Sequence, residues 1–154
     1  IGDLAFFYDM NVIGNRHIGS NIRLLLVNNG KGTEFRQFNH IAAAFGGEAD
    51  RFIAAAGHFG NQSQTLVKHY AGDLGFEYFS AANKQEFEEV YHHFLLPQIT
   101  ERPMLFEVFT DSAEESEALE RIINMAKDLK GRVKKIAKEM LGGNSLNVLK
   151  KITR

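Results

Sequence analysis

The chain has 154 residues, a formal net charge of -1 and no cysteine. Its 44% hydrophobic and 24% charged content is that of an ordinary globular domain with enough chain for a core, and the lack of cysteine excludes disulfides, thiolate metal sites and a cysteine nucleophile. No apolar run is long enough to span a membrane, so we expect a cytoplasmic protein with no membrane partner.

Charge is distributed unevenly along the chain. Residues 1–126 contain 9 of the 18 Lys and Arg residues but 17 of the 19 Asp and Glu residues, so residues 127–154 are strongly basic. A basic segment can bind nucleic acid, but no aromatic residue interleaves these basic ones, as a base-stacking surface would require. We expect the segment to pack against an acidic surface of its own chain or of a neighbouring subunit, and we expect no nucleic-acid partner.

The beginning of the chain predicts a βαβ unit. Gly2 is expected to end a strand, apolar residues at helical spacing predict a helix over residues 7–18, and a nearly continuous apolar run predicts a buried parallel strand over residues 22–27. Because the chain opens on Ile1 rather than Met, we expect it to be a fragment of a longer protein that lacks most of its first strand.

The middle of the chain continues this alternation. Two alanine triplets in the glycine-rich region predict two short helices, at residues 42–44 and 54–56. Further helices are predicted over residues 63–74 and 84–96, the second capped by Asn83 with Glu86 and ended by Pro97, and further strands over residues 76–79 and 104–109. The order predicts an α/β fold: a doubly wound parallel sheet with helices on both faces, which binds ligands at the carboxyl ends of its strands.

A C-terminal helical extension follows the last strand. Ser112, with Glu115 three residues later, is expected to cap a long helix. Apolar residues then recur at alternating steps of three and four, as in a coiled-coil seam: Leu119, Ile122, Ala126, Leu129, Val133, Ile136 and Met140. Gly142 and Gly143 are expected to end this helix, and Ser145 to cap a last short one.

Polar residues at two predicted strand ends suggest a ligand site. Asp3 follows the first strand, and Asn28 and Asn29 follow the next. Hard cations such as Mg2+ prefer oxygen donors of this kind, and the N–H groups of Leu4 and Ala5 at a helix N-terminus attract phosphate. Taken singly, Asp3 is explained as a helix cap and the Asn pair as a turn. Together, with a buried strand between them, they predict a metal–diphosphate site.

These residues also carry a resemblance to a known family. Gly2-Asp3 followed by Asn28-Asn29 resembles the thiamine-diphosphate (ThDP) motif of the pyruvate oxidase and decarboxylase superfamily. The longer stretch at residues 2–11 is similar to the branch of menaquinone-pathway synthases that join a decarboxylated 2-oxoglutarate unit to isochorismate. The resemblance covers roughly residues 1–125 and implies a domain at 1–126 that binds ThDP diphosphate and magnesium, followed by a basic helical tail at 127–154.

The resemblance also implies a set of site residues. Those implied in cofactor binding are Gly2, Asp3, Leu4, Ala5, Asn29 and Lys31. Asp3, Asn29 and the backbone carbonyl of Lys31 are implied as magnesium ligands, and the Leu4 and Ala5 N–H groups as donors to the diphosphate.

The implied reaction is decarboxylation of a 2-oxoacid and transfer of the resulting carbanion to an acceptor. The family's catalytic Glu lies in a pyrimidine-binding domain of the same or a partner chain. The resemblance therefore implies no catalytic residue in this chain, an inactive fragment when alone, and a homodimer or tetramer for the intact enzyme. Which 2-oxoacid and which acceptor are used stays open.

Two other functions are considered. The same fold could serve as a non-catalytic assembly or regulatory module that acts through the seam at residues 119–140. Asp3 could instead be the nucleophile of a phosphate-ester hydrolase. That enzyme would need further acidic metal ligands at neighbouring strand ends, and only Asp111 is placed for this.

Four further residues could meet substrate. His40 and His58 flank the alanine triplets, and Lys31 and Arg36 could bind a carboxylate; glycine-rich loops often carry function, although plain solvation is the alternative for each.

Three other polar residues are expected to have no role in the site. His92 and His93 are adjacent on a helix, so their rings diverge and are expected at the exposed surface. Glu107 in an apolar strand is explained by an edge position or an Arg partner.

Overall fold

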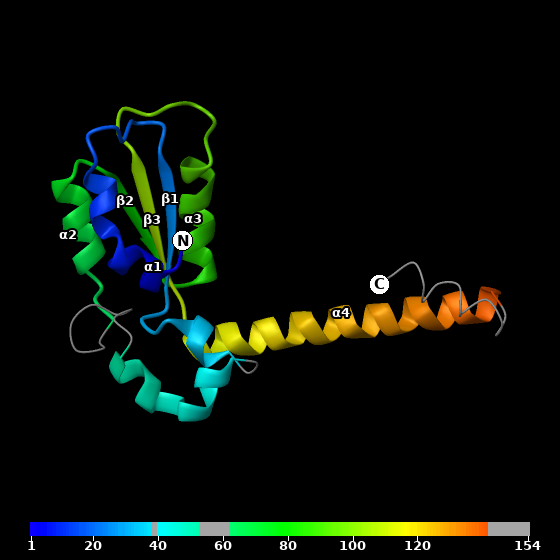
Figure 1. Ribbon diagram of the computed structural model, residues 1–154. Coiled ribbons are helices and arrows are strands. Elements are labelled where there is room, and N and C mark those ends of the chain that lie inside the picture. The colour runs from blue at the N-terminus through cyan, green and yellow to red at the C-terminus, as the bar shows by residue number, and fades with distance from the viewer. Residues whose placement is uncertain (38–39, 53–61, 142–154) are drawn as a thin grey trace. The chain divides into compact units, whose positions relative to one another are not determined.

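The computed structural model describes residues 1–37, 40–52 and 62–141 (Figure 1). The chain divides into two units, Ile1–Ser116 and Glu117–Arg154. The first unit contains the sheet and the candidate site. The second contains most of the long C-terminal helix and is described by itself.

The first unit is built on a three-stranded sheet. Its strands are β1 (Arg23–Asn28), β2 (Glu77–Ala81) and β3 (Met104–Phe109). Both pairings are parallel and the strand order is β1-β3-β2, so β3, the last of these three strands in sequence, is the central one. Gly2 adds an isolated parallel bridge to Val27, whose N–H donates to the Ile1 carbonyl at 2.9 Å. The predicted parallel α/β sheet is confirmed.

Helices cover both faces of this sheet. Helices α1 (Asp3–Tyr8) and α2 (Leu66–Asp73) pack on one face, and α3 (Lys84–Phe94) packs on the other (Figure 1). The first core includes Phe6, Leu26 and Leu105, and the second is centred on Phe94 and Phe106. Successive β3 side chains alternate between these two cores, which confirms the doubly wound arrangement.

The first helix differs from its predicted range of 7–18. It starts at Asp3 and ends at Tyr8, and a 3₁₀ segment, Met10–Gly14, follows after a break at Asp9 (φ -134°, ψ 31°). Asn11 and the two β-branched residues after it favour helix only weakly, which is consistent with the break. The apolar spacing was correct, since Phe6 and Ile13 are only 2% and 6% exposed.

The glycine-rich region forms 3₁₀ segments rather than regular helices. Thr33–Arg36 is one, and Ile41–Phe52 is another, interrupted at Gly46 (φ 51°, ψ -136°). The first alanine triplet lies in the second segment. The second triplet lies outside the described residues.

The capping prediction for α3 is confirmed. The Glu86 N–H donates to Asn83 Oδ1 at 3.0 Å, and Glu86 Oε2 accepts the Ala82 N–H at 2.8 Å. The helix ends at Phe94, before Pro97, two residues earlier than predicted.

Helix α4 (Ser112–Leu141) is one continuous helix of 30 residues, as predicted. Its cap is Asp111 rather than Ser112, because Asp111 Oδ1 accepts the N–H groups of Ala113 and Glu114 at 2.8 and 3.1 Å. In the second unit, large apolar side chains of α4 are 59–65% exposed: Ile122, Met125, Leu129 and Val133. No helix in the described ranges is long and apolar enough to cross a membrane. The short helix predicted from Ser145 lies outside them.

Candidate cofactor site at the carboxyl edge of the sheet

The structure brings Asp3 to the turn that follows β1. The Asp3 side chain is 2% exposed. Its Oδ2 accepts the Gly30 N–H at 2.6 Å, and its Oδ1 accepts the Leu4 N–H at 2.7 Å. Gly30 has φ 74°, a left-handed conformation that glycine adopts without strain. The expected meeting of the two strand ends is therefore observed.

Burial and hydrogen bonding act in opposite directions on the pKa of the Asp3 carboxyl group. Burial raises its pKa above the usual range, and the nearby Glu115 carboxylate adds a smaller rise. Hydrogen bonds from the backbone N–H groups of Gly30, Leu4 and Asn29 oppose this rise. An ionised Asp3 would therefore be stabilised further by a cation at this position.

Asn29 is held by contacts at both ends of its carboxamide. Its Oδ1 accepts the Lys31 N–H at 2.9 Å, and its Nδ2 donates to Glu115 Oε2 at 2.8 Å. Glu115 also accepts a hydrogen bond from the Thr110 hydroxyl. Sequence analysis assigned Glu115 only to a helix cap, since no local pattern indicates a contact between residues 86 positions apart.

The other implied cofactor-binding residues surround α1 and the turn. Gly2 precedes α1 as its N-cap residue. Gly2, Ala5 and Lys31 are exposed, and Leu4 is half-buried with its N–H directed to Asp3. Their roles toward a diphosphate remain predictions.

The donors at this edge fit a hard cation with a phosphate ligand. Asp3 offers a carboxylate, Asn29 an amide oxygen and Lys31 a backbone carbonyl, all of which are oxygen donors. The Thr33 hydroxyl, in the segment after this turn, is buried and has no hydrogen-bond partner among the described residues, so a bound polar group could satisfy it. No group of three or more His, Cys, Asp and Glu in the described ranges could hold a metal; the donor set above contains one such residue.

Glu107 is neither on an edge strand nor paired with Arg, contrary to the sequence-based explanation. It lies on the central strand β3 and is 0% exposed. Its Oε1 accepts Asn28 Nδ2 and its Oε2 accepts the Tyr78 hydroxyl, each at 2.6 Å. Burial raises the pKa of Glu107, and these two hydrogen bonds oppose the rise only in part. The sequence pattern of β3 could not indicate these hydrogen bonds, because Asn28 and Tyr78 lie on the two flanking strands, β1 and β2.

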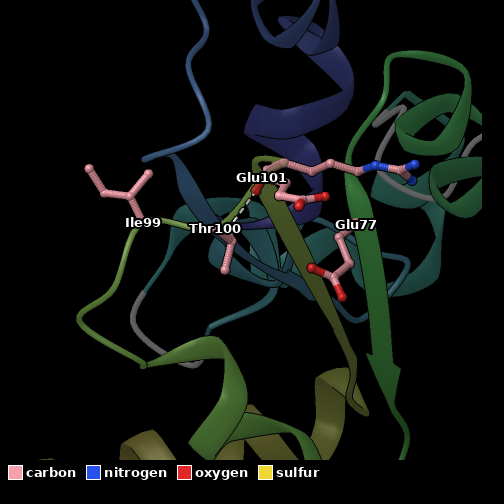
Figure 2. Close-up of a pocket in the computed structure, with 5 residues that line it drawn as sticks. Glu77, Ile99, Thr100 and Glu101 are labelled. Carbon is pink, nitrogen blue, oxygen red and sulfur yellow. Dashed lines mark hydrogen bonds between the residues drawn. The ribbon is translucent and has the colours of Figure 1, made fainter.

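One hollow in the described part of the chain lies away from this site (Figure 2). It has a volume of about 470 Å³ and is lined by Glu77, Ile99, Thr100, Glu101 and Arg102. Glu77 begins β2 and the other four residues precede β3, so the hollow is at the amino ends of the strands. Its Thr100 hydroxyl donates to the Arg102 carbonyl at 2.8 Å. Ligands of doubly wound sheets bind at the opposite edge.

The glycine-rich region contains a second hollow, of about 380 Å³. Its lining is mostly apolar: Phe35, Ala42, Phe45, Glu48, Ala49 and Phe52. The His40 ring lies edge-on to that of Phe35, 5.3 Å between centroids, and its Nδ1 accepts the Ala42 N–H at 3.1 Å. His58 and the Arg36 side chain lie outside the described residues, so contacts of these residues with substrate stay predictions.

The other residues considered in the sequence, His92, His93 and Asp111, lie at the surface or at a helix end. His92 and His93 are exposed, as predicted, and His93 Nε2 lies 3.6 Å from Glu77 Oε1. Asp111 caps α4, and its backbone hydrogen bonds lower its pKa.

Comparison with known proteins decides the family. No protein-family model matches the chain. The chain is 34% identical over 128 residues to 2-succinyl-5-enolpyruvyl-6-hydroxy-3-cyclohexene-1-carboxylate synthase of Bacteroides fragilis, a match that covers 83% of the chain and 22% of the synthase. The chain is a relative of these synthases. The synthases of the same name from Phocaeicola vulgatus and Bacteroides thetaiotaomicron are 37% and 34% identical, each over 77% of the chain and 20% of the synthase.

The synthase relationship confirms the resemblance predicted from Gly2-Asp3 and Asn28-Asn29. The chain spans about a fifth of the length of the synthases that it matches. The aligned part, 77–83% of the chain, is long enough to include the sheet and the candidate site.

Proposed function

We propose that this chain is the cofactor-diphosphate-binding part of a ThDP- and magnesium-dependent enzyme. The enzyme decarboxylates a 2-oxoacid in the cytoplasm and transfers the resulting carbanion to an acceptor. The observation that carries this proposal is the contact between the buried Asp3 carboxylate and the Asn28–Lys31 turn, in a chain related to named synthases. The resemblance of residues 2–11 makes 2-oxoglutarate the proposed donor, and the name of the relatives makes a 2-succinyl cyclohexene carboxylate the proposed product.

The residues of this chain hold and orient the cofactor in the proposal. When bound, ThDP supplies an electron sink for decarboxylation. Asp3, Asn29 and the Lys31 carbonyl would hold the cation, which neutralises the diphosphate. The Ala5 N–H group would face the diphosphate from the start of α1, beside the Leu4 N–H group, which in this structure donates to Asp3 Oδ1.

The acid–base group that acts on the cofactor belongs, in the proposal, to a pyrimidine-binding domain. That domain comes from the same chain or from a partner subunit. The active enzyme is therefore proposed to be a homo-oligomer, with the site between domains and its two small-molecule substrates bound there.

The test of this proposal is Asp3→Ala in the full-length protein. We expect Mg2+-dependent ThDP binding to be lost, because the substitution removes the buried carboxylate that faces the Gly30 N–H. Isothermal titration calorimetry with ThDP, with and without Mg2+, measures this.

The matched control is Asp9→Ala, which removes an exposed acidic group just after α1 and should leave ThDP affinity unchanged. Circular dichroism verifies that both variants are folded. Wild-type affinity in a folded Asp3→Ala variant would remove Asp3 from the ligand set.

A second candidate function is favoured by one observation. The apolar side chains of Ile122, Met125, Leu129 and Val133 are largely exposed on α4, which fits a non-catalytic assembly module that associates through this helix. Such a module would not bind ThDP with Mg2+, so the titration of the wild-type protein separates the two functions.

A further inference from the structure

Glu107 is a buried carboxyl group that the proposed cofactor chemistry does not use. It stands at the fourth position of β3, paired in register with Leu26 of β1 and Ser80 of β2. Taking an ionisable group out of water is costly unless it is well hydrogen-bonded. Its two partners, Asn28 and Tyr78, each bond one carboxyl oxygen.

The Asn28 carboxamide is held by hydrogen bonds at both of its ends. A carboxylate can only accept hydrogen bonds, so the Asn28 Nδ2 group must face Glu107, as it does at 2.6 Å. The Asn28 Oδ1 atom then faces the turn and accepts the Gly30 N–H at 3.1 Å and the Gln62 Nε2 group at 3.5 Å. The same N–H donates to Asp3 Oδ2 at 2.6 Å. Glu107 is thus connected to Asp3 through one side chain, that of Asn28, and one backbone amide, that of Gly30.

The backbone carbonyl of Asn28 also accepts two hydrogen bonds. The Gln62 Nε2 group donates to the Asn28 carbonyl at 2.7 Å, and the Thr110 N–H donates to the same carbonyl at 3.1 Å. With the Asn28 backbone held on β1, the Gly30 N–H lies between its two acceptors, Asp3 Oδ2 and Asn28 Oδ1. Among the described residues, Glu107 is the acceptor at the Nδ2 end of the carboxamide.

We propose that Glu107 is a positioning residue for the cation-binding turn and that it acts through Asn28. By orienting the carboxamide of Asn28, it fixes the Gly30 amide between Asp3 and Asn28, and so fixes the donors of Asp3 and Asn29 in place. This inference rests on the proposed function, because its first test measures Mg2+ binding. Residues that orient metal ligands typically contribute 10–100-fold to metal affinity.

The structure offers a matched control in Tyr78. Its hydroxyl donates to the other oxygen of the same carboxyl group at the same distance, but among the described residues it forms no hydrogen bond with Asn28 or with the turn. Tyr78→Phe leaves one Glu107 oxygen without its donor, as Glu107→Leu leaves Asn28 without its acceptor. Only the second change frees the turn.

The experiment titrates Mg2+ at a fixed ThDP concentration in the full-length protein, followed by calorimetry. We expect Glu107→Leu to raise the half-saturating Mg2+ concentration about 10–100-fold, and Tyr78→Phe to change it by less than about 3-fold. Glu107→Gln should restore affinity, because its amide oxygen can accept from Asn28 while its amide nitrogen donates to Tyr78. Equal shifts in Glu107→Leu and Tyr78→Phe would overturn the proposal.

A double-variant cycle tests the route through Asn28. If Glu107 acts only by orienting Asn28, then Glu107→Leu adds little to the loss already caused by Asn28→Ala. Independent, additive losses in Mg2+ affinity would show that Glu107 acts by another route, and would overturn the proposal.

Failure of the proposed function is distinguishable from failure of this inference. A folded wild-type protein that does not bind ThDP with Mg2+ would overturn the proposed function alone. Hydrogen exchange at the Gly30 amide, measured relative to the β3 amides, then reads the positioning directly. Faster exchange at Gly30 in Glu107→Leu than in Tyr78→Phe supports the inference, and equal exchange overturns it.

Discussion

Asp3, Asn28 and Glu107 are at most 2% exposed, and each is polar or ionisable. Buried polar groups need hydrogen-bond partners. The Leu4 and Gly30 N–H groups donate to Asp3, and Glu107 accepts from Asn28 and from Tyr78 of β2. The site is therefore built from residues whose burial is costly unless all the contacts are made together.

Glu107 also makes stability depend on pH. Its folded-state pKa is raised by burial, so the folded protein holds this proton more tightly than the unfolded chain. The stabilisation is complete below the unfolded-state pKa of about 4.3 and is lost as pH rises through the raised folded value. We therefore expect Glu107→Gln to lose less stability than wild type as pH rises from about 4.3.

Urea denaturation at a series of pH values measures this difference. Asp3 also has a raised pKa and interacts electrostatically with Glu107, so the difference between the two curves reports on Glu107 together with its effect on Asp3. Parallel pH profiles for wild type and Glu107→Gln would contradict the expectation.

At the residue scale, sequence analysis could place Asp3 beside the turn of Asn28 and Asn29, because carboxyl ends of parallel strands share one edge. It could not find the partners of Glu107 or of Asn29. Those partners, Tyr78 and Glu115, come from distant segments that only the strand order brings close.

At the element scale, helix boundaries follow local chemistry. The Asn83 cap was predictable because its signal lies within four residues, and the structure shows the expected bond to the Glu86 N–H. The range of α1 was predicted wrongly, since its apolar spacing continues through a 3₁₀ segment that buries the same face.

The Asn83 cap should make a measurable contribution to stability. Asn83→Ala removes the acceptor of the Glu86 N–H and should lower the unfolding free energy by about 1 kcal/mol. Chemical denaturation measures this, with exposed Gln85→Ala as a control inside the same helix. A loss no larger than that of the control would show that water satisfies the amide equally well.

The apolar stripe of α4 has consequences for assembly. Ile122 and Leu129 are 63% and 59% exposed, and exposed apolar stripes at coiled-coil spacing favour association between helices. We expect Ile122→Asp with Leu129→Asp to lower the molar mass of the full-length protein in light scattering.

The control for this experiment places the same side chain elsewhere on α4. Asn124→Asp with Lys127→Asp changes exposed residues outside the stripe and should leave the mass unchanged. An unaltered mass in the stripe variant would mean that α4 does not mediate assembly.

At the scale of the whole molecule, the chain corresponds to about a fifth of its relatives. In the proposed function it supplies only the diphosphate side of the active site. Residues 1–154 alone should therefore release no CO2 from 2-oxoglutarate with ThDP and Mg2+, whereas the full-length protein should release it. Turnover by the 154-residue chain would contradict the proposed division of the active site.

The sequence by itself determined the order of strands and helices, the parallel sheet, the edge at which Asp3 and Asn29 lie, and the family. These follow from local periodicity, capping residues and short motifs, all of which are properties of neighbouring positions. Tertiary structure alone decided that β3 is central, that Glu107 is buried between Asn28 and Tyr78, and that Glu115 holds Asn29. The physical reason is that the order of strands across the sheet, and the pairing of polar groups between them, depend on contacts between distant segments that local periodicity does not record.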